Sequence, residues 1–152
     1  MHRAVVNESA FEEHEDRWIL GLRDLAVTKI SVDFQLTLLL GSEAWAILEC
    51  PFRLGQGSAG SDNLQEVLDP GRQDVAAALA LFGAKVLSAV AFKAGSLRLV
   101  FDSGLHLNCR AYPSFEAWQV VGPGGWRFVS MPGGNLAVWS AGTESTARGG
   151  EG

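Results

Sequence analysis

Histidines and carboxylates are the first candidates for chemistry, because a metal ion needs several such ligands that converge from short spacings. The three histidines, His2, His14 and His106, are scattered along the chain. His14 lies in the acidic run 12–16, where a neighbouring carboxylate could join it at a metal ion. Such a run is more typical of a solvated surface. We predict no metal site.

Cysteine and serine are the next candidates, as nucleophiles that need a base within hydrogen-bond reach. No Gly-x-Ser-x-Gly elbow occurs. His106 and Cys109 are three positions apart on an expected strand, so their side chains face opposite sides. Cys50 and Cys109 fall at similar places in the two halves of the chain and could be neighbours, and buried thiols are favoured over a disulfide. The sequence thus predicts no catalytic centre.

The string Gly55–Gly60 matches Gly-x-Gly-x-x-Gly, the pattern whose glycines let backbone amides approach a pyrophosphate. A dinucleotide site also needs a preceding strand, an immediate helix and a later acidic residue. Here the polar, Gly-rich stretch continues to Asn63, which indicates a flexible loop. We expect no cofactor.

Tryptophans and an acidic segment are the remaining features that could form a surface for a partner. We expect Trp118 and Trp139 to fill the core, and Trp126, which follows two glycines, to be exposed beside Arg127. The predicted partner-binding surface consists of Glu12, Glu13, Glu15, Asp16, Trp126 and Arg127.

Composition limits the class of protein that has to position these residues. The chain has 152 residues, of which 47% are hydrophobic, enough for one core. Its net charge of -5, with no basic stripe, argues against nucleic acid as a partner. No apolar run approaches the roughly 20 residues of a membrane span, and the N-terminus does not resemble a secretory signal. We expect one cytoplasmic domain over residues 1–140 and a disordered tail over 141–152.

Two helices are predicted among the strands. Ser9-Ala-Phe-Glu12 has the form of a capping box and predicts a short N-terminal helix that ends near Leu20. Asp69-Pro70 and Gly83 predict a second helix over about 70–82. Because the second half of this segment has almost no polar face, we expect the helix to be buried against a sheet.

Alternating apolar residues predict strands elsewhere. One hairpin turns at Gly41-Ser42, others turn at 93–96 and 102–104, and the last three strands form a meander that ends at Trp139. The Leu36 and Leu97 hairpins suggest a duplicated three-strand unit with a spacing near 60 residues. The predicted fold is mainly β (α+β), with antiparallel strands closing into a sandwich or half-barrel.

The C-terminal half carries motifs of a family resemblance. They are Ala78–Gly83, Phe101–Gly104, Phe115–Trp118, Gly122–Gly125 and Pro132–Trp139. Over about Leu25 to Trp139, the chain resembles a bacterial, mainly actinobacterial, family of small proteins of unknown function. The resemblance implies a compact cytosolic protein and supplies no activity, cofactor or catalytic residue. Some members look like small accessory or immunity-type proteins.

We therefore expect a non-enzymatic protein-binding module of the immunity type or a regulatory accessory protein, whose acidic segment would steer a basic partner. The alternative is a small-ligand carrier or regulator with an aromatic-lined pocket. A homodimer through a sheet edge is a secondary expectation.

Overall fold

A computed structural model describes residues 10–57 and 65–140. The predicted tail and part of the Gly55–Gly60 string lie outside these residues. The strands are β1 (Phe11–Glu13), β2 (Arg17–Leu20), β3 (Val27–Val32), β4 (Leu36–Leu40), β5 (Ala44–Leu48), β6 (Phe52–Gln56), β7 (Gln65–Leu68), β8 (Val86–Phe92), β9 (Leu97–Phe101), β10 (Leu105–Cys109), β11 (Trp118–Val121), β12 (Arg127–Ser130) and β13 (Leu136–Trp139).

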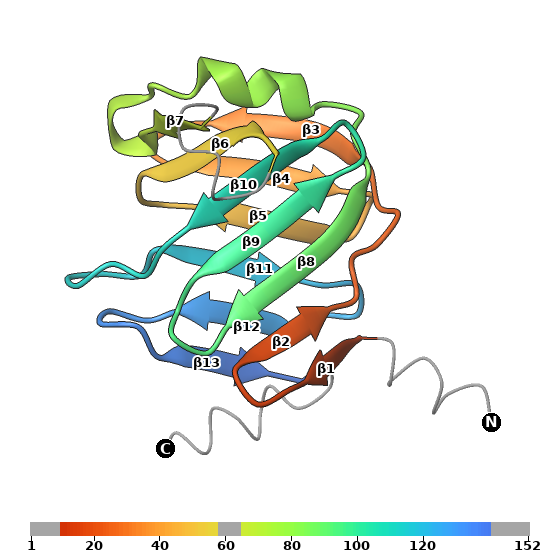
Figure 1. Ribbon diagram of the computed structural model, residues 1–152, viewed down its shortest axis with the longest axis vertical. Coiled ribbons are helices and arrows are strands. Elements are labelled where there is room, and N and C mark those ends of the chain that lie inside the picture. The colour runs from red at the N-terminus through yellow and green to blue at the C-terminus, as the bar shows by residue number, and fades with distance from the viewer. Residues whose placement is uncertain (1–9, 58–64, 141–152) are drawn as a thin grey trace.

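These strands form two antiparallel sheets that face each other (Figure 1). The seven-stranded sheet has the order β1-β2-β8-β9-β10-β6-β7, and the six-stranded sheet has the order β13-β12-β11-β5-β4-β3. An isolated bridge between Ala26 and Lys85 links the sheets at one corner, but the sheets do not close into a barrel. The predicted mainly β, antiparallel fold is confirmed, and the facing sheets agree with its sandwich form.

Alternation along each strand builds the core between the sheets. Leu36, Leu38 and Leu40 of β4 are fully buried, whereas the residues between them face outward and are only partly covered. Strand β9 has the same pattern from Leu97 to Phe101. Because neighbouring side chains on a strand point to opposite faces, one face of each sheet is apolar core and the other is outer surface.

The two central meanders, β3-β4-β5 and β8-β9-β10, lie in different sheets and share one pairing pattern. Leu36 pairs with Leu48, and Leu97 pairs with Cys109, so the second pair lies 61 residues beyond the first. Register shifts interrupt both meanders at matching places, after Val27 and after Val86. The registers match near the spacing of the predicted repeat, whose origin by duplication stays a prediction.

Each meander is followed by a strand that crosses to the other sheet. Strand β6 leaves the first meander and pairs with β10, while β11 leaves the second and pairs with β5 (Figure 1). The seven-stranded sheet therefore joins strands far apart in sequence. This crossing brings Arg53 of β6 beside Asn108 of β10.

The predicted N-terminal helix is wrong. In the described part of that segment, β1 and β2 form a hairpin in which Phe11 pairs with Leu20, and β2 pairs with the edge of β8. Phe11 and Trp18 do share an apolar face, as the helix would require, but they use it to pack against the sheets. Tertiary pairing with an open sheet edge has overridden the weak local preference for helix.

The predicted buried helix over 70–82 is also wrong. Two short 3-10 segments occupy it, η2 (Pro70–Arg72) and η3 (Ala76–Leu81). The Asp69 carboxylate does accept a hydrogen bond from the Gly71 amide at 3.0 Å, but left-handed Gln73 (φ 58°) ends the first segment. Only part of η3 is buried, since Leu79 is 61% exposed. Among the described residues, no helix has the length and apolar character needed to cross a membrane.

Candidate functional site

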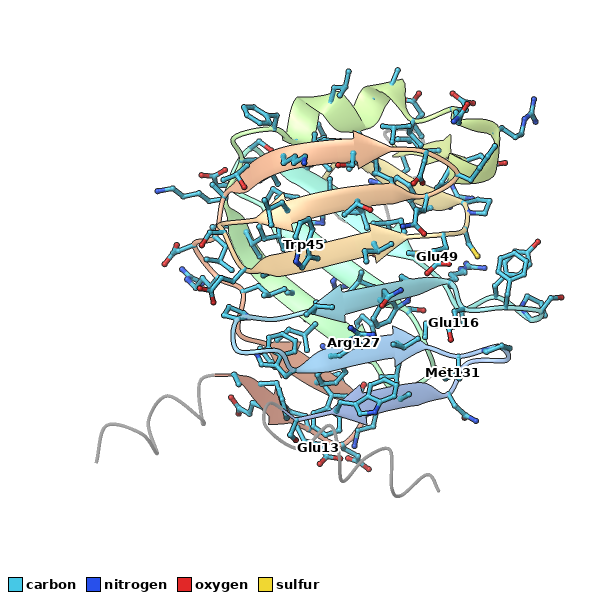
Figure 2. All side chains as sticks on the ribbon, turned by 180° about the vertical axis from the view of Figure 1, so that it is seen from behind. Glu13, Trp45, Glu49, Glu116, Arg127 and Met131 are labelled. Atoms are coloured by element: carbon cyan, nitrogen blue, oxygen red, sulfur yellow. The ribbon has the colours of Figure 1, made fainter. Side chains whose placement is uncertain are left out.

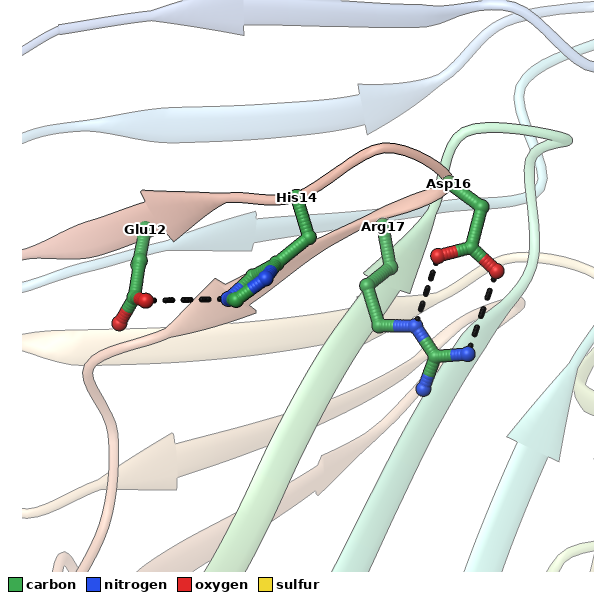
Figure 3. A network of polar contacts seen from close by, with 4 residues as sticks. All are labelled: Glu12, His14, Asp16 and Arg17. Carbon is green, nitrogen blue, oxygen red and sulfur yellow. Dashed lines mark hydrogen bonds and ion pairs between the residues drawn. The ribbon is translucent and has the colours of Figure 1, made fainter.

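The acidic segment lies on the β1–β2 hairpin, with most of its charges paired locally. Glu12 contacts His14 at 3.0 Å, and Asp16 accepts two hydrogen bonds from the Arg17 guanidinium at 3.0 and 3.2 Å (Figure 3). The bond from Arg17 lowers the pKa of the Asp16 carboxyl. Glu13 pairs with Lys93 of the β8–β9 turn.

Of the predicted acidic residues, Glu13 and Asp16 pair with a cationic side chain, Glu12 contacts an imidazole that is charged only when protonated, and Glu15 has no such partner within the described part of the chain. The segment is exposed, as predicted, but its neighbours neutralise much of its charge. A basic partner would therefore meet a weaker field than the sequence suggests.

Trp126 does not lie at the surface, and this prediction is wrong. Its side chain is 1% exposed and contacts Phe11 and Phe128, with ring centroids 5.6 and 5.7 Å away. Arg127 is exposed as predicted, because the next residue along a strand points to the other face. The structure therefore separates the two residues that the sequence analysis placed together.

The two tryptophans that were predicted to fill the core differ in their burial. Trp118 is fully buried, which confirms its prediction, and its indole donates to the carbonyl of Gly95 at 2.9 Å. Trp139 is only partly buried and pairs with Arg127 on the outer face of the six-stranded sheet, contrary to its predicted core role. Figure 2 shows that face, with Trp45 and Arg127 projecting from it.

The thiols are buried, and each donates a hydrogen bond to a backbone carbonyl. Cys50 and Cys109 are free cysteines, and burial raises their pKa values to about 11 and about 12. Cys50 lies two residues before β6, the strand that pairs with β10, so the two cysteines lie on neighbouring segments of the chain. Among the described residues, no group of three or more His, Cys, Asp or Glu could hold a metal ion.

A different site lies on the outer face of the seven-stranded sheet. Across β9, β10 and β6, cross-strand pairing places Arg98, Asn108 and Arg53 in one row. The row continues to Val67 on β7. Adjacent strands lie about 4.8 Å apart, so the Cα atoms of the two arginines lie close on either side of that of Asn108. We call this set of three polar side chains the Arg-Asn-Arg row.

Phe92 on β8 supports one end of this row. The Arg98 guanidinium carbon lies 5.2 Å from the centroid of the Phe92 ring, and that of Arg17 lies 5.0 Å from it. Such cation–π contacts hold a guanidinium over a ring. Arg17 is also bound to Asp16, whereas Arg98 has no acidic partner within the described residues. Arg98 is thus held in place without being neutralised.

A hollow of about 660 Å³ opens beside the row. The residues lining it are Pro51, Phe52, Arg53, Gln65, Val67, Phe92, Ser96, Asn108, Cys109 and Arg110. No acidic residue is among these described lining residues, although the whole chain is acidic. Its volume falls in the range of small-molecule sites.

Polar atoms near the hollow are buried without a hydrogen-bond partner. They are Nδ2 of Asn108, both amide atoms of Gln65, and Nδ1 of His106, which lies on the same sheet face. An unpartnered buried polar group costs roughly 1–3 kcal/mol, so such groups are rare and call for an explanation. A ligand that pairs with them would supply one.

The sequence analysis missed this site because it did not predict β6 and β7. Phe52-Arg53-Leu54 does alternate, but Gly55 interrupts the pattern and the following loop obscures β7. Arg98 and Asn108 lie at outward positions of predicted strands, which is the signal that was available. Only the pairing of β6 with β10 unites them with Arg53.

Fold and site together define a two-sheet antiparallel β protein with an arginine-lined hollow on one outer face. A family model described as "Family of unknown function (DUF6188)" matches residues 18–140, and the chain belongs to that family. The match begins at Trp18 and leaves out β1. No curated protein and no solved structure gives a significant match.

Proposed function

We propose that this protein is a non-enzymatic binding module that holds a small ligand in the hollow on its seven-stranded sheet. The observation that carries the proposal is the unpartnered Nδ2 of Asn108, between two arginines that also lack acidic partners among the described residues. Natural proteins retain unfavourable buried polar groups chiefly where function requires them.

The chemistry of the lining suits binding better than catalysis. Guanidinium and amide groups orient a ligand through hydrogen bonds, and Val67 and Phe92 offer apolar contact. The one cysteine among the lining residues, Cys109, has its side chain in the core, and burial raises the pKa of its thiol to about 12, so it stays protonated and weakly nucleophilic at neutral pH.

Screening of chemically diverse metabolite-like compounds by thermal shift tests the proposal, using wild-type protein and Asn108→Leu. At least one compound should raise the Tm of the wild type and have little effect on the variant, because Leu keeps the shape of Asn but cannot form hydrogen bonds. Arg127→Gln, on the other sheet, serves as the control and should respond as the wild type does. If every stabilising compound acts equally on Asn108→Leu, the hollow is not the site.

A protein-binding role is the second candidate, and a row on the outer face of the six-stranded sheet favours it. Pairing places Leu39, Trp45, Val121, Arg127 and Trp139 in one line across five strands. Tryptophan and arginine are enriched at protein interfaces. In this role the protein would be an immunity-type or regulatory accessory protein whose partner docks on this row, and the acidic hairpin would play a lesser part.

Affinity capture with matched variants tests this second role. A specific partner should bind the wild type and Arg53→Gln but not Trp45→Ser, since Trp45 is in the proposed interface (Figure 2). Equal capture by all three proteins would count against it. We also propose a cytoplasmic location, which the two buried free cysteines favour. A homodimer through a sheet edge completes the proposal.

A further inference from the structure

We infer that the ligand of the hollow is a small oxyanion carrying two or more negative charges, on carboxylate or phosphate oxygens. This inference rests on the proposed function and adds the chemical class of the ligand. It follows from the donors in the hollow, their spacing, and the charge that they gather.

The free donors in and beside the hollow point to an anion. Arg53, Arg98 and Arg110 form no ion pair and no side-chain hydrogen bond with any described residue. A guanidinium carries only donors, and it meets carboxylate or phosphate oxygens through two parallel bonds. Nδ2 of Asn108 adds another unused donor. The ligand must supply the acceptors.

The spacing fits one compact anion. Arg98, Asn108 and Arg53 lie on three adjacent strands, so their Cα atoms span about 10 Å at the usual strand spacing. Arg53 can lean toward a small ligand above the central amide, while the Arg98 guanidinium lies against Phe92, which itself lines the hollow. Arg110 continues β10 by one residue beyond Cys109 and lines the same hollow.

The charge balance calls for more than one negative charge. Three guanidiniums without an acidic partner among the described residues share this face, no described residue of the lining is acidic, and the chain as a whole has a net charge of -5. Like charges held close together repel one another, and the partly covered site screens that repulsion less than open water does. A dicarboxylate or a phosphate dianion would relieve most of it.

The remaining lining suggests where the uncharged part of the ligand lies. Val67 is 52% exposed on β7, and Pro51 precedes β6 at the same end of the hollow. A short carbon chain would contact these two side chains while its charged groups meet the arginines. Inorganic phosphate, which has no carbon chain, would make only the polar contacts.

Titration of inorganic phosphate, succinate and citrate into the full-length protein, followed by calorimetry and thermal shift, tests the inference. The buffer holds chloride as its only other anion, and ionic strength is kept constant. We expect saturable binding with Kd near or below about 1 mM, the range that a few charge-assisted hydrogen bonds provide. Binding of phosphate alone, of carboxylates alone, or of both identifies the source of the oxyanion and supports the inference.

Matched arginine variants locate the binding. Arg53→Gln and Arg98→Gln should each weaken binding about tenfold or more, because each removes a charge-assisted pair. Arg127→Gln, which changes an exposed arginine on the opposite sheet, should bind as the wild type does. Arg98 also contacts Phe92, so Arg53→Gln, which has no such contact, decides the case if Arg98→Gln is unstable.

Three outcomes would overturn the inference, and they separate it from the proposed function. Equal weakening of oxyanion binding in Arg127→Gln would show that the anions are attracted to positive charge in general and not to the hollow. If no oxyanion binds while a neutral or cationic compound stabilises the wild type but not Asn108→Leu, the ligand class is wrong and the binding module stands. If neither oxyanions nor the diverse compounds act through Asn108, both proposals fall.

Discussion

The indole of Trp126 lies directly against Gly122, so that a Cβ atom added to Gly122 would fall 1.8 Å from Cε2 of the ring. The turn between them is closed by hydrogen bonds from the Gly122 amide to the Trp126 carbonyl at 2.8 Å, and from the Gly125 amide to the Gly122 carbonyl at 2.9 Å. The ring therefore folds back into the core, where it meets Phe11 and Phe128.

Gly122→Ala should destabilise the protein by about 3 kcal/mol, the upper end of the usual effect of overpacking, because the added methyl group overlaps a ring with little room to move. Urea unfolding followed by tryptophan fluorescence measures the loss. Gly71→Ala is the control: the nearest atom to its new Cβ is 3.4 Å away, and its φ is ordinary. A Gly122→Ala protein as stable as this control would contradict the observed packing.

The Gly95 carbonyl ties the two sheets together, since it accepts hydrogen bonds from Trp118 Nε1 at 2.9 Å and from Ser130 Oγ at 2.8 Å. Ser130→Ala should cost about 1 kcal/mol, because the carbonyl keeps one partner. Trp118→Phe also leaves one partner, but it adds a cavity. The double variant should cost at least about 0.5 kcal/mol more than the sum, because the buried carbonyl is then unpaired. Additive losses in a double-mutant cycle would argue against a shared acceptor.

Strand faces could be predicted from the sequence, because alternation depends only on neighbouring residues. The β4–β5 hairpin and the burial of Trp118 follow directly from it. The capping box before Phe11 gave the wrong element, because the open edge of β8 offered β2 partners that local propensity cannot reveal. Trp126 was misplaced because the glycines before it mark a turn but do not say on which face the next ring lies.

The candidate site depends on long-range pairing, which is why sequence reasoning did not find it. Arg53 and Asn108 lie 55 positions apart in the sequence, and they meet only because β6 crosses to the sheet of the second meander. No local pattern encodes such a crossing. A search for lone arginines at outward strand positions would have found Arg98. It would not have indicated that Arg98 and Arg53 lie on the same face of one sheet.

Leu79 and Leu81 lie on the same 3-10 segment but should differ strongly in their response to truncation. Leu81 is fully buried, so Leu81→Ala should cost roughly 2–5 kcal/mol, the range seen for buried leucines. Leu79 is 61% exposed, and Leu79→Ala should change stability by less than about 0.5 kcal/mol. Chemical denaturation of both variants provides the comparison. A large loss in Leu79→Ala would favour the continuous buried helix over the two short segments.

Alkaline conditions should destabilise the protein through its thiols. Burial raises the pKa values of Cys50 and Cys109 from 9.0 to about 11 and about 12. Below pH 9 both states keep the thiol protons and the contribution to stability is fully present. As pH rises from about 9 towards 11 or 12, the unfolded chain loses these protons while the folded chain retains them, so stability falls.

Cys109→Ala isolates this effect, because it removes one of the two raised groups. Urea denaturation should be measured between about pH 8 and about pH 10.5, the window in which the unfolded thiol ionises. Over this window the free energy of unfolding of the variant should decline less steeply than that of the wild type. Only the slopes are compared, since the variant also loses packing at a buried position. Thiol labelling at pH 8 gives an independent measure and should be much slower in the folded protein than in urea, because the thiolate is the reactive form. Equal slopes, together with rapid labelling of the folded protein, would contradict the burial of Cys109.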